Sequence, residues 1–139
     1  MVALATMIKH RGRSVGSLDK LVKIAAGMGA YVQDKGWDDA LLAEIAREKF
    51  NLSSGPVDWS KRPKRDAFEL LKKNAPCIAS IRKDFKKSGG GHLIVVWKIS
   101  HKCVFYNEPA AEERRHVRRR VGISIFLRGW KRRIIVVKK

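Results

Sequence analysis

The sequence has few cysteines, few acidic residues and no long hydrophobic run. Its 139 residues include two cysteines, which are too few for a disulfide framework and favour a reducing compartment. The apolar runs are about as long as a strand, so none is long enough to cross a membrane. The N-terminus is apolar first and basic second, which is not the order of a secretory signal. We therefore expect a cytoplasmic protein, with an organelle transit segment as the alternative because basic residues precede the first acidic one.

The shortage of acidic residues leaves a strong positive charge. Lys and Arg total 31 against 13 for Asp and Glu, which gives a formal net charge of +18. Such a field attracts polyanions such as nucleic acid, anionic lipid or acidic proteins, but it says little about the fold. Hydrophobic residues make up 45% of the chain, enough for a core in one domain over residues 1–139. No internal repeat or low-complexity linker divides it.

The first half of the chain has the apolar spacing of helices. Apolar residues recur every three or four positions after Ser17, which is a good N-cap residue. Trp37 precedes another such stripe, and Pro63 suits the first turn of a short helix. We expect helices over residues 2–10, 17–28, from Asp38 or Asp39 onward and 63–73, with a loop over 51–62.

After residue 74 the pattern changes to that of strands. Residues 92–99 are nearly continuously apolar, which predicts a central strand buried on both faces. We also expect strands over 77–81, 103–106 and 133–137, a charged connection over 83–91, a charge run over 112–120 and a short helix over 124–130. Helices over 1–74 followed by an antiparallel sheet over 75–139 predict an α+β fold.

Two places in the strand half carry candidate chemistry. His92 begins the central strand, and Asn107 and Glu108 end the strand that pairs back with it. The start of one hairpin strand lies beside the end of its partner, so we expect these residues to be neighbours. A histidine held at a strand end suits a general base, and an adjacent carboxylate or amide orients its ring. The alternative is that His92 only begins a strand and that residues 107–109 form an ordinary turn.

Several segments in order resemble one family. The runs P-C-I-A-S-I, G-G-G-H-L-I-V-V-W-K-I and V-F-Y-N-E-P are similar to those of the bacteriocin-processing (double-glycine leader) peptidases. The closing I-S-I-F-L-R-G-W and R-I-I-V-V, and the helices before and after Gly36-Trp37, continue the likeness over nearly the whole chain. The resemblance implies a papain-like cysteine peptidase fold, with N-terminal helices packed on a C-terminal antiparallel sheet. It also implies a peptide or protein ligand and no cofactor.

The resemblance assigns roles to the candidate residues. It makes His92 the general base and the Asn107-Glu108 corner its orienting partner. The family usually has aspartate where Glu108 stands, and glutamate is one methylene longer, so the contact would need a shifted backbone or would fall to Asn107. We rank Glu108 ahead of Asn107, although an asparagine can also hold the imidazole.

The resemblance leaves the nucleophile unaccounted for. It places that cysteine at or immediately before Met1, where this chain has none. Cys77 lies in an apolar strand, and Cys103 begins the return strand at the hairpin end opposite His92. With His101 and Lys102, Cys103 also offers too few ligands for a metal site. We therefore predict a peptidase-like chain that is inactive as given, either an N-terminally shortened form or a pseudoenzyme that binds peptides.

A third interpretation is that the chain binds nucleic acid or another polyanion. Basic residues with an interleaved aromatic ring can neutralise phosphates and stack on bases. No recognised nucleic-acid motif accompanies them, and a solvated basic surface is the alternative. The candidate residues are Arg114, Arg115, Arg118, Arg119, Arg120, Trp130, Lys131, Arg132 and Arg133.

Overall fold

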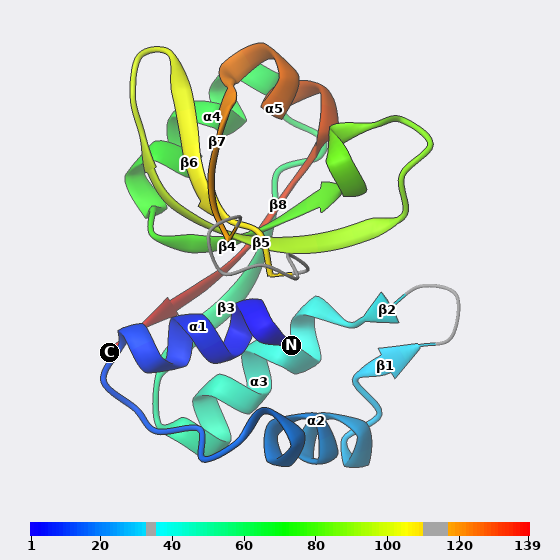
Figure 1. Cartoon of the computed structure of the whole chain (residues 1–139), viewed down its shortest axis with the longest axis vertical. Helices are drawn as coiled ribbons and strands as arrows, with labels where there is room; N and C mark the ends of the chain where they lie inside the picture. Colours follow the sequence, from blue (N-terminus) through cyan, green and yellow to red (C-terminus); the bar gives the residue numbers. More distant parts are fainter. Residues whose placement is uncertain (33–35, 110–116) are drawn as a thin grey trace.

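The computed structural model describes residues 1–32, 36–109 and 117–139 (Figure 1). Five α-helices and eight strands are found in this part of the chain, together with one short 3-10 helix. The helices are α1 Val2–His10, α2 Leu18–Gly27, α3 Asp39–Phe50, α4 Lys64–Asn74 and α5 Ile123–Gly129, and the 3-10 helix is η1 Lys83–Phe85. The strands are β1 Tyr31–Val32, β2 Gly36–Trp37, β3 Ser53–Asp58, β4 Cys77–Arg82, β5 Gly91–Ile99, β6 Cys103–Asn107, β7 Arg118–Gly122 and β8 Trp130–Lys138.

Side-chain caps start α2 and α3 where the sequence predicts them. The Ser17 side chain accepts a hydrogen bond from the Lys20 amide, and the Asp38 carboxylate accepts one from the Leu41 amide. Each cap satisfies a backbone donor that the first helical turn leaves unpaired. The caps fix where the helices begin, and Asp38 thereby becomes the residue just outside α3.

The main sheet is six-stranded and antiparallel, in the order β3-β8-β4-β5-β6-β7. The last strand, β8, enters between β3 and β4, so the C-terminal segment joins the two halves of the chain. The β5–β6 hairpin has one irregularity, a shift in register between Val96 and Lys98. Such a bulge changes which residues of the paired strands share a face.

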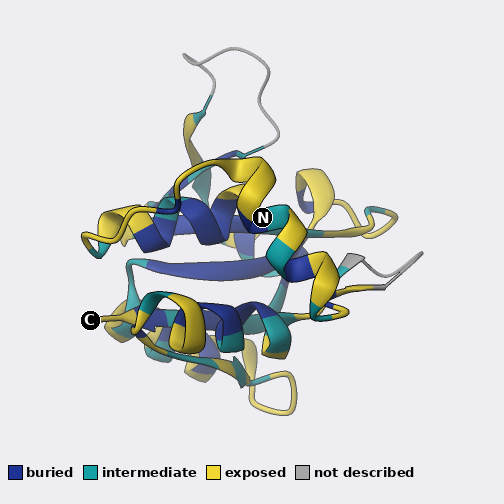
Figure 2. Ribbon diagram, turned by 90° about the horizontal axis from the view of Figure 1, so that it is seen from below, coloured by how far each residue is buried: buried dark blue, intermediate teal, exposed yellow. Residues whose placement is uncertain are grey.

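Helices cover both faces of this sheet. On one face, α1, α2 and α3 pack over residues such as Ile78, Val95 and Ile135. On the other, α4 and α5 pack over Ile94 and Val96. Residues 94–96 are therefore buried on both sides, as their continuous apolar run predicts. Figure 2 shows the buried positions of the helices turned inward and the exposed ones turned outward.

The structure corrects two sequence predictions. Residues 51–62 were expected to form a loop, but they contain β3, which pairs with β8 at one edge of the sheet. Edge strands tolerate proline and alternate in burial, so S-S-G-P-V-D lacks the apolar signal of a central strand. The end of the charge run forms β7, at the opposite edge, where charged side chains are common. No helix in the described part of the chain is long and apolar enough to cross a bilayer.

Candidate functional site

His92 lies at the start of β5, opposite Ile81 of β4. The apolar residues that follow it are buried in the sheet and hold its backbone, while the His92 side chain keeps 17% of its surface exposed. Its Nε2 atom lies 2.6 Å from Oε1 of Glu108, whose side chain is 10% exposed. A carboxylate accepts, so Nε2 of His92 is the donor in this bond.

The register shift in the hairpin makes this contact possible. Asn107 pairs with Val95, so one further residue would place Glu108 opposite Ile94, on the same face of the sheet as His92. Without the shift, Glu108 would be opposite Val95 and would point to the other face. The two residues are therefore diagonal neighbours, a separation of about 7–8 Å between backbones that a long side chain can close. Glutamate is one methylene longer than aspartate, which helps the Glu108 carboxylate reach the His92 ring across this distance.

The expected proximity of His92 and Glu108 is confirmed, whereas the contact proposed for Asn107 is not made. Asn107 is on the opposite face of β6, and its Oδ1 atom is buried and accepts no hydrogen bond from the residues that the structure describes. The Glu108 amide donates to the Val117 carbonyl at 2.6 Å, which fixes the backbone of the corner. Glu108 alone of the two candidates orients the imidazole, and a catalytic role for His92 stays a prediction.

A cleft of about 900 Å³ adjoins His92. Met1, the N-cap residue of α1, and the first residues of the helix line it together with His92, so this helix end and the imidazole share one cavity. The cleft is also lined by residues that the sequence analysis did not assign to a site, including Asp39 and Ser80. Burial raises the pKa of the Asp39 carboxyl, although Arg133 opposes that shift. Only the fold brings these separate segments together.

Neither cysteine lines this cleft in the structure. Cys77 is four positions before Ile81 along β4, roughly 13 Å at the rise of a strand, and it is fully buried. Burial raises the pKa of its thiol to about 12, so the reactive thiolate is scarce at neutral pH. Cys103 pairs with Gly122 at the far end of the hairpin. Among the described residues, no group of three or more His, Cys, Asp or Glu side chains is placed to hold a metal ion.

The basic residues named as candidates for polyanion binding lie in separate parts of the structure. Arg118, Arg119 and Arg120 lie on β7 and line a second cavity, whereas Lys131 and Arg133 lie on β8 and line the His92 cleft. The separation follows from the sheet order, in which β4, β5 and β6 lie between these two strands. Arg114 and Arg115 fall outside the described residues.

Trp130 and Arg132 both make contacts within the chain. Trp130 is 4% exposed, and its ring stacks on Phe126 with centroids 5.4 Å apart. A ring held in the core cannot stack on a base, so the binding role predicted for Trp130 is wrong. Arg132 donates a hydrogen bond to the Arg62 carbonyl at 2.7 Å, which turns it toward a neighbouring loop.

Comparison with known proteins gives similarity in structure alone. No family profile matches the sequence, and no curated protein matches it. One similar solved structure is the peptidase domain of Streptococcus ComA, a bi-functional ABC transporter involved in a quorum sensing pathway. It superposes with a TM-score of 0.72 and 17% sequence identity, and the match covers 98% of this chain and 87% of that chain.

Two further structures agree with it. A double glycine motif protease from an AMS/PCAT transporter, solved in complex with the leader peptide, gives a TM-score of 0.68 at 18% identity over 98% of this chain and 80% of that one. The N-terminal peptidase C39-like domain of the toxin secretion ATP-binding protein from Vibrio parahaemolyticus gives a TM-score of 0.62 at 16% identity. That match covers 99% of this chain and 94% of that one. At these identities the likeness shows the fold, and it confirms the α+β prediction: the chain has the papain-like fold of C39 double-glycine peptidase domains.

Proposed function

We propose that this chain is a peptidase-type domain that binds a peptide in the cleft beside His92. The observation that carries the proposal is the His92–Glu108 pair, because it holds the imidazole of a residue that lines the cleft. A histidine held in this way by a carboxylate is what a papain-like site needs from its general base. The leader peptide bound to one of the solved structures supports a peptide as ligand.

We further propose that neither cysteine of this chain acts as the nucleophile. Cleavage by covalent catalysis needs a thiolate within hydrogen-bond reach of the imidazole. Cys77 is buried on β4 and Cys103 lies at the far end of the hairpin, so neither meets that requirement. The chain with this sequence is therefore a peptide-binding domain that does not turn its ligand over.

The cleft has charges of both signs around His92. Asp39 and Asp58 line one part of it, and Lys131 and Arg133 come from β8. Burial lowers the pKa of the Lys131 amine, and the neighbouring Arg133 lowers it further. An extended peptide can pair polar groups with both sets, whereas a polyanion would meet repulsion from the carboxylates.

A titration with a fluorescently labelled peptide that contains a Gly-Gly pair tests this proposal. Ala40 is exposed and lines the cleft, so Ala40→Trp should obstruct it and weaken binding by about tenfold or more, a loss of roughly 1.4 kcal/mol. Ala26 of α2 is also exposed and lines neither the cleft nor the second cavity, which makes Ala26→Trp the matched control. Equal effects of the two variants, or no binding, would contradict the proposed cleft.

Mass spectrometry of the same peptide after incubation tests the absence of turnover. We expect no cleavage product with the purified chain. Cleavage that is lost in His92→Ala, or after alkylation of Cys103, would refute the proposal that neither cysteine serves as nucleophile.

A further inference from the structure

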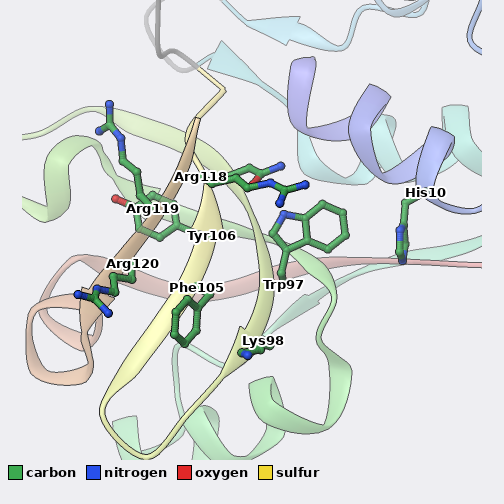
Figure 3. Close-up of a pocket in the computed structure, with 9 residues that line it drawn as sticks. His10, Trp97, Lys98, Phe105, Tyr106, Arg118, Arg119 and Arg120 are labelled. Atoms are coloured by element: carbon green, nitrogen blue, oxygen red, sulfur yellow. The ribbon is translucent and has the colours of Figure 1, made fainter. Parts of the chain in front are cut away.

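A second cavity, of about 720 Å³, lies over β5, β6 and β7, away from His92 (Figure 3). Aromatic and basic side chains line it, and the close-up shows Trp97, Phe105 and the three arginines of β7 gathered around it. None of its described lining residues is acidic. We call this cavity the basic groove. Its volume is within the usual range for sites that hold a small molecule or a short stretch of a polymer.

Strand register explains why cations surround an aromatic ring in the basic groove. Phe105 of β6 is opposite Lys98 on one side and opposite Arg120 on the other. Directly paired residues share a face of the sheet, so both cations flank the same ring. The Lys98 ammonium lies 5.0 Å from the centre of the Phe105 ring, close enough for a cation–π contact.

Arg118 and Trp97 complete this arrangement. Arg118 is two residues before Arg120 on β7 and is opposite Asn107, so both arginines are on the face of Phe105. Trp97 occupies the register shift of β5, which places it beside Lys98 at the groove. Its ring meets His10 edge to face at 4.9 Å, and this contact orients it.

The exposed cations of the groove are available to an anion. Lys98, Arg118 and Arg120 are exposed, and no ion pair of theirs occurs within the described residues. Arg119 is engaged with Tyr106 and is not needed for the inference. Guanidinium groups present a planar set of donors that matches the oxygens of a phosphate.

Asn107 adds a hydrogen-bond requirement. Its Oδ1 atom is buried and has no hydrogen-bond partner among the described residues, and an unpaired buried acceptor is destabilising. A phosphate or carboxylate at neutral pH has no proton to donate to it. A ligand that satisfies the whole groove therefore needs negative charge, a flat ring and an N–H donor.

We propose that the basic groove binds a nucleoside phosphate, carried by a mononucleotide or by a single strand of nucleic acid. Arg118 and Arg120 bind the phosphate, the base stacks on Phe105 or Trp97, and an N–H of the base donates to Asn107. Single strands expose the face of each base, whereas a duplex hides it, so the groove discriminates against duplexes. This proposal does not depend on the peptide function of the His92 cleft.

The test is a fluorescence titration with a labelled single-stranded oligonucleotide, the same sequence as a duplex, and a mononucleotide. Replacing Arg118 and Arg120 by Gln should weaken single-strand binding by at least about tenfold. It should also reduce the slope of log affinity against log salt by roughly 0.7, because the two arginines bind one phosphate and each neutralised phosphate contributes about 0.7. The double variant Arg65→Gln, Lys73→Gln removes the same charge from α4 and should change neither quantity.

Phe105→Leu keeps an apolar side chain but loses the ring face, so it should weaken single strands several-fold while the salt slope stays unchanged. Mononucleotide binding with the same dependence on Arg118 and Arg120 identifies a small nucleotide as a ligand, and binding of the oligonucleotide alone identifies a strand. An equal loss in the α4 control, tighter binding of the duplex or of an acidic peptide, or no binding at low salt overturns the proposal. A loss caused by Ala40→Trp would instead place the nucleic acid in the His92 cleft.

Discussion

The contact between His92 and Glu108 should make a measurable contribution to stability. Its atoms are 2.6 Å apart, and the two side chains are 17% and 10% exposed. A hydrogen bond to a charged group that is shielded in this way contributes about 1.5–3 kcal/mol, whereas an exposed ion pair contributes about 0–1 kcal/mol. We expect a coupling free energy in the first range.

A double-mutant cycle measures that quantity. The free energy of unfolding in urea at pH 7 is determined for the unmodified chain, His92→Ala, Glu108→Ala and the double variant. The sum of the two single losses should exceed the loss in the double variant by about 1.5–3 kcal/mol, because the first substitution already removes the contact. The cycle separates this pairwise contribution from any packing that each side chain makes alone.

The chain contains its own control pair. Lys72 and Glu69 lie 3.1 Å apart on α4, with side chains 41% and 60% exposed. Solvent screens such a pair, so the same cycle with Lys72→Ala and Glu69→Ala should give a coupling of about 0.5 kcal/mol or less. If the His92–Glu108 coupling is no larger than that of this exposed pair, the inference that Glu108 holds the imidazole is wrong.

Three further outcomes are expected. Iodoacetamide at pH 8 should modify Cys103 in the folded chain and Cys77 only after unfolding, because burial raises the pKa of the Cys77 thiol to about 12; mass spectrometry that found Cys77 modified first would contradict this. Leu4→Ala should lower the free energy of unfolding by about 2–5 kcal/mol, since Leu4 of α1 is fully buried in the core that this helix shares with the sheet. A loss below about 1 kcal/mol would contradict that packing. In thermal unfolding, Gly129→Ala should destabilise the chain by about 1–3 kcal/mol, because the added Cβ would lie 2.4 Å from the main chain of η1. Gly27→Ala should stabilise the chain by about 0.5–1 kcal/mol, because its added Cβ meets no atom within 4 Å and alanine favours a helix more than glycine does.

Much of the fold follows from local patterns in the sequence. Ser17 and Asp38 indicate where two helices begin, because a short polar side chain can cap an unpaired backbone amide in the first turn of a helix. The continuous apolar run before Ile99 indicates a strand covered on both faces. The strands at the sheet edges, β3 and β7, have no such signal, because an edge strand buries too little surface to demand apolar residues.

Hairpin connectivity alone predicts that His92 and the Asn107-Glu108 corner are close, since paired strands return to the same end. Which of the two corner residues faces His92 depends on the register shift near Trp97, and a shift of one residue exchanges the faces of a strand. Composition does not encode that shift. It arises where the pairing of β5 with β6 meets the packing of Trp97 against α1, and it places Glu108 at the imidazole and Asn107 at the basic groove.

The basic residues illustrate the same division. Their number and their clustering in the sequence establish the positive charge of the chain, which does not depend on how it folds. Their location does depend on the fold, because β8 lies inside the sheet, between β3 and β4, while β7 lies at an edge. That arrangement buries Trp130 in the core, brings Lys131 and Arg133 to the His92 cleft, and leaves Arg118 and Arg120 beside Phe105. The sequence alone determined the charge, the helices and the central strands, and the long-range pairing of strands decided which side chains meet.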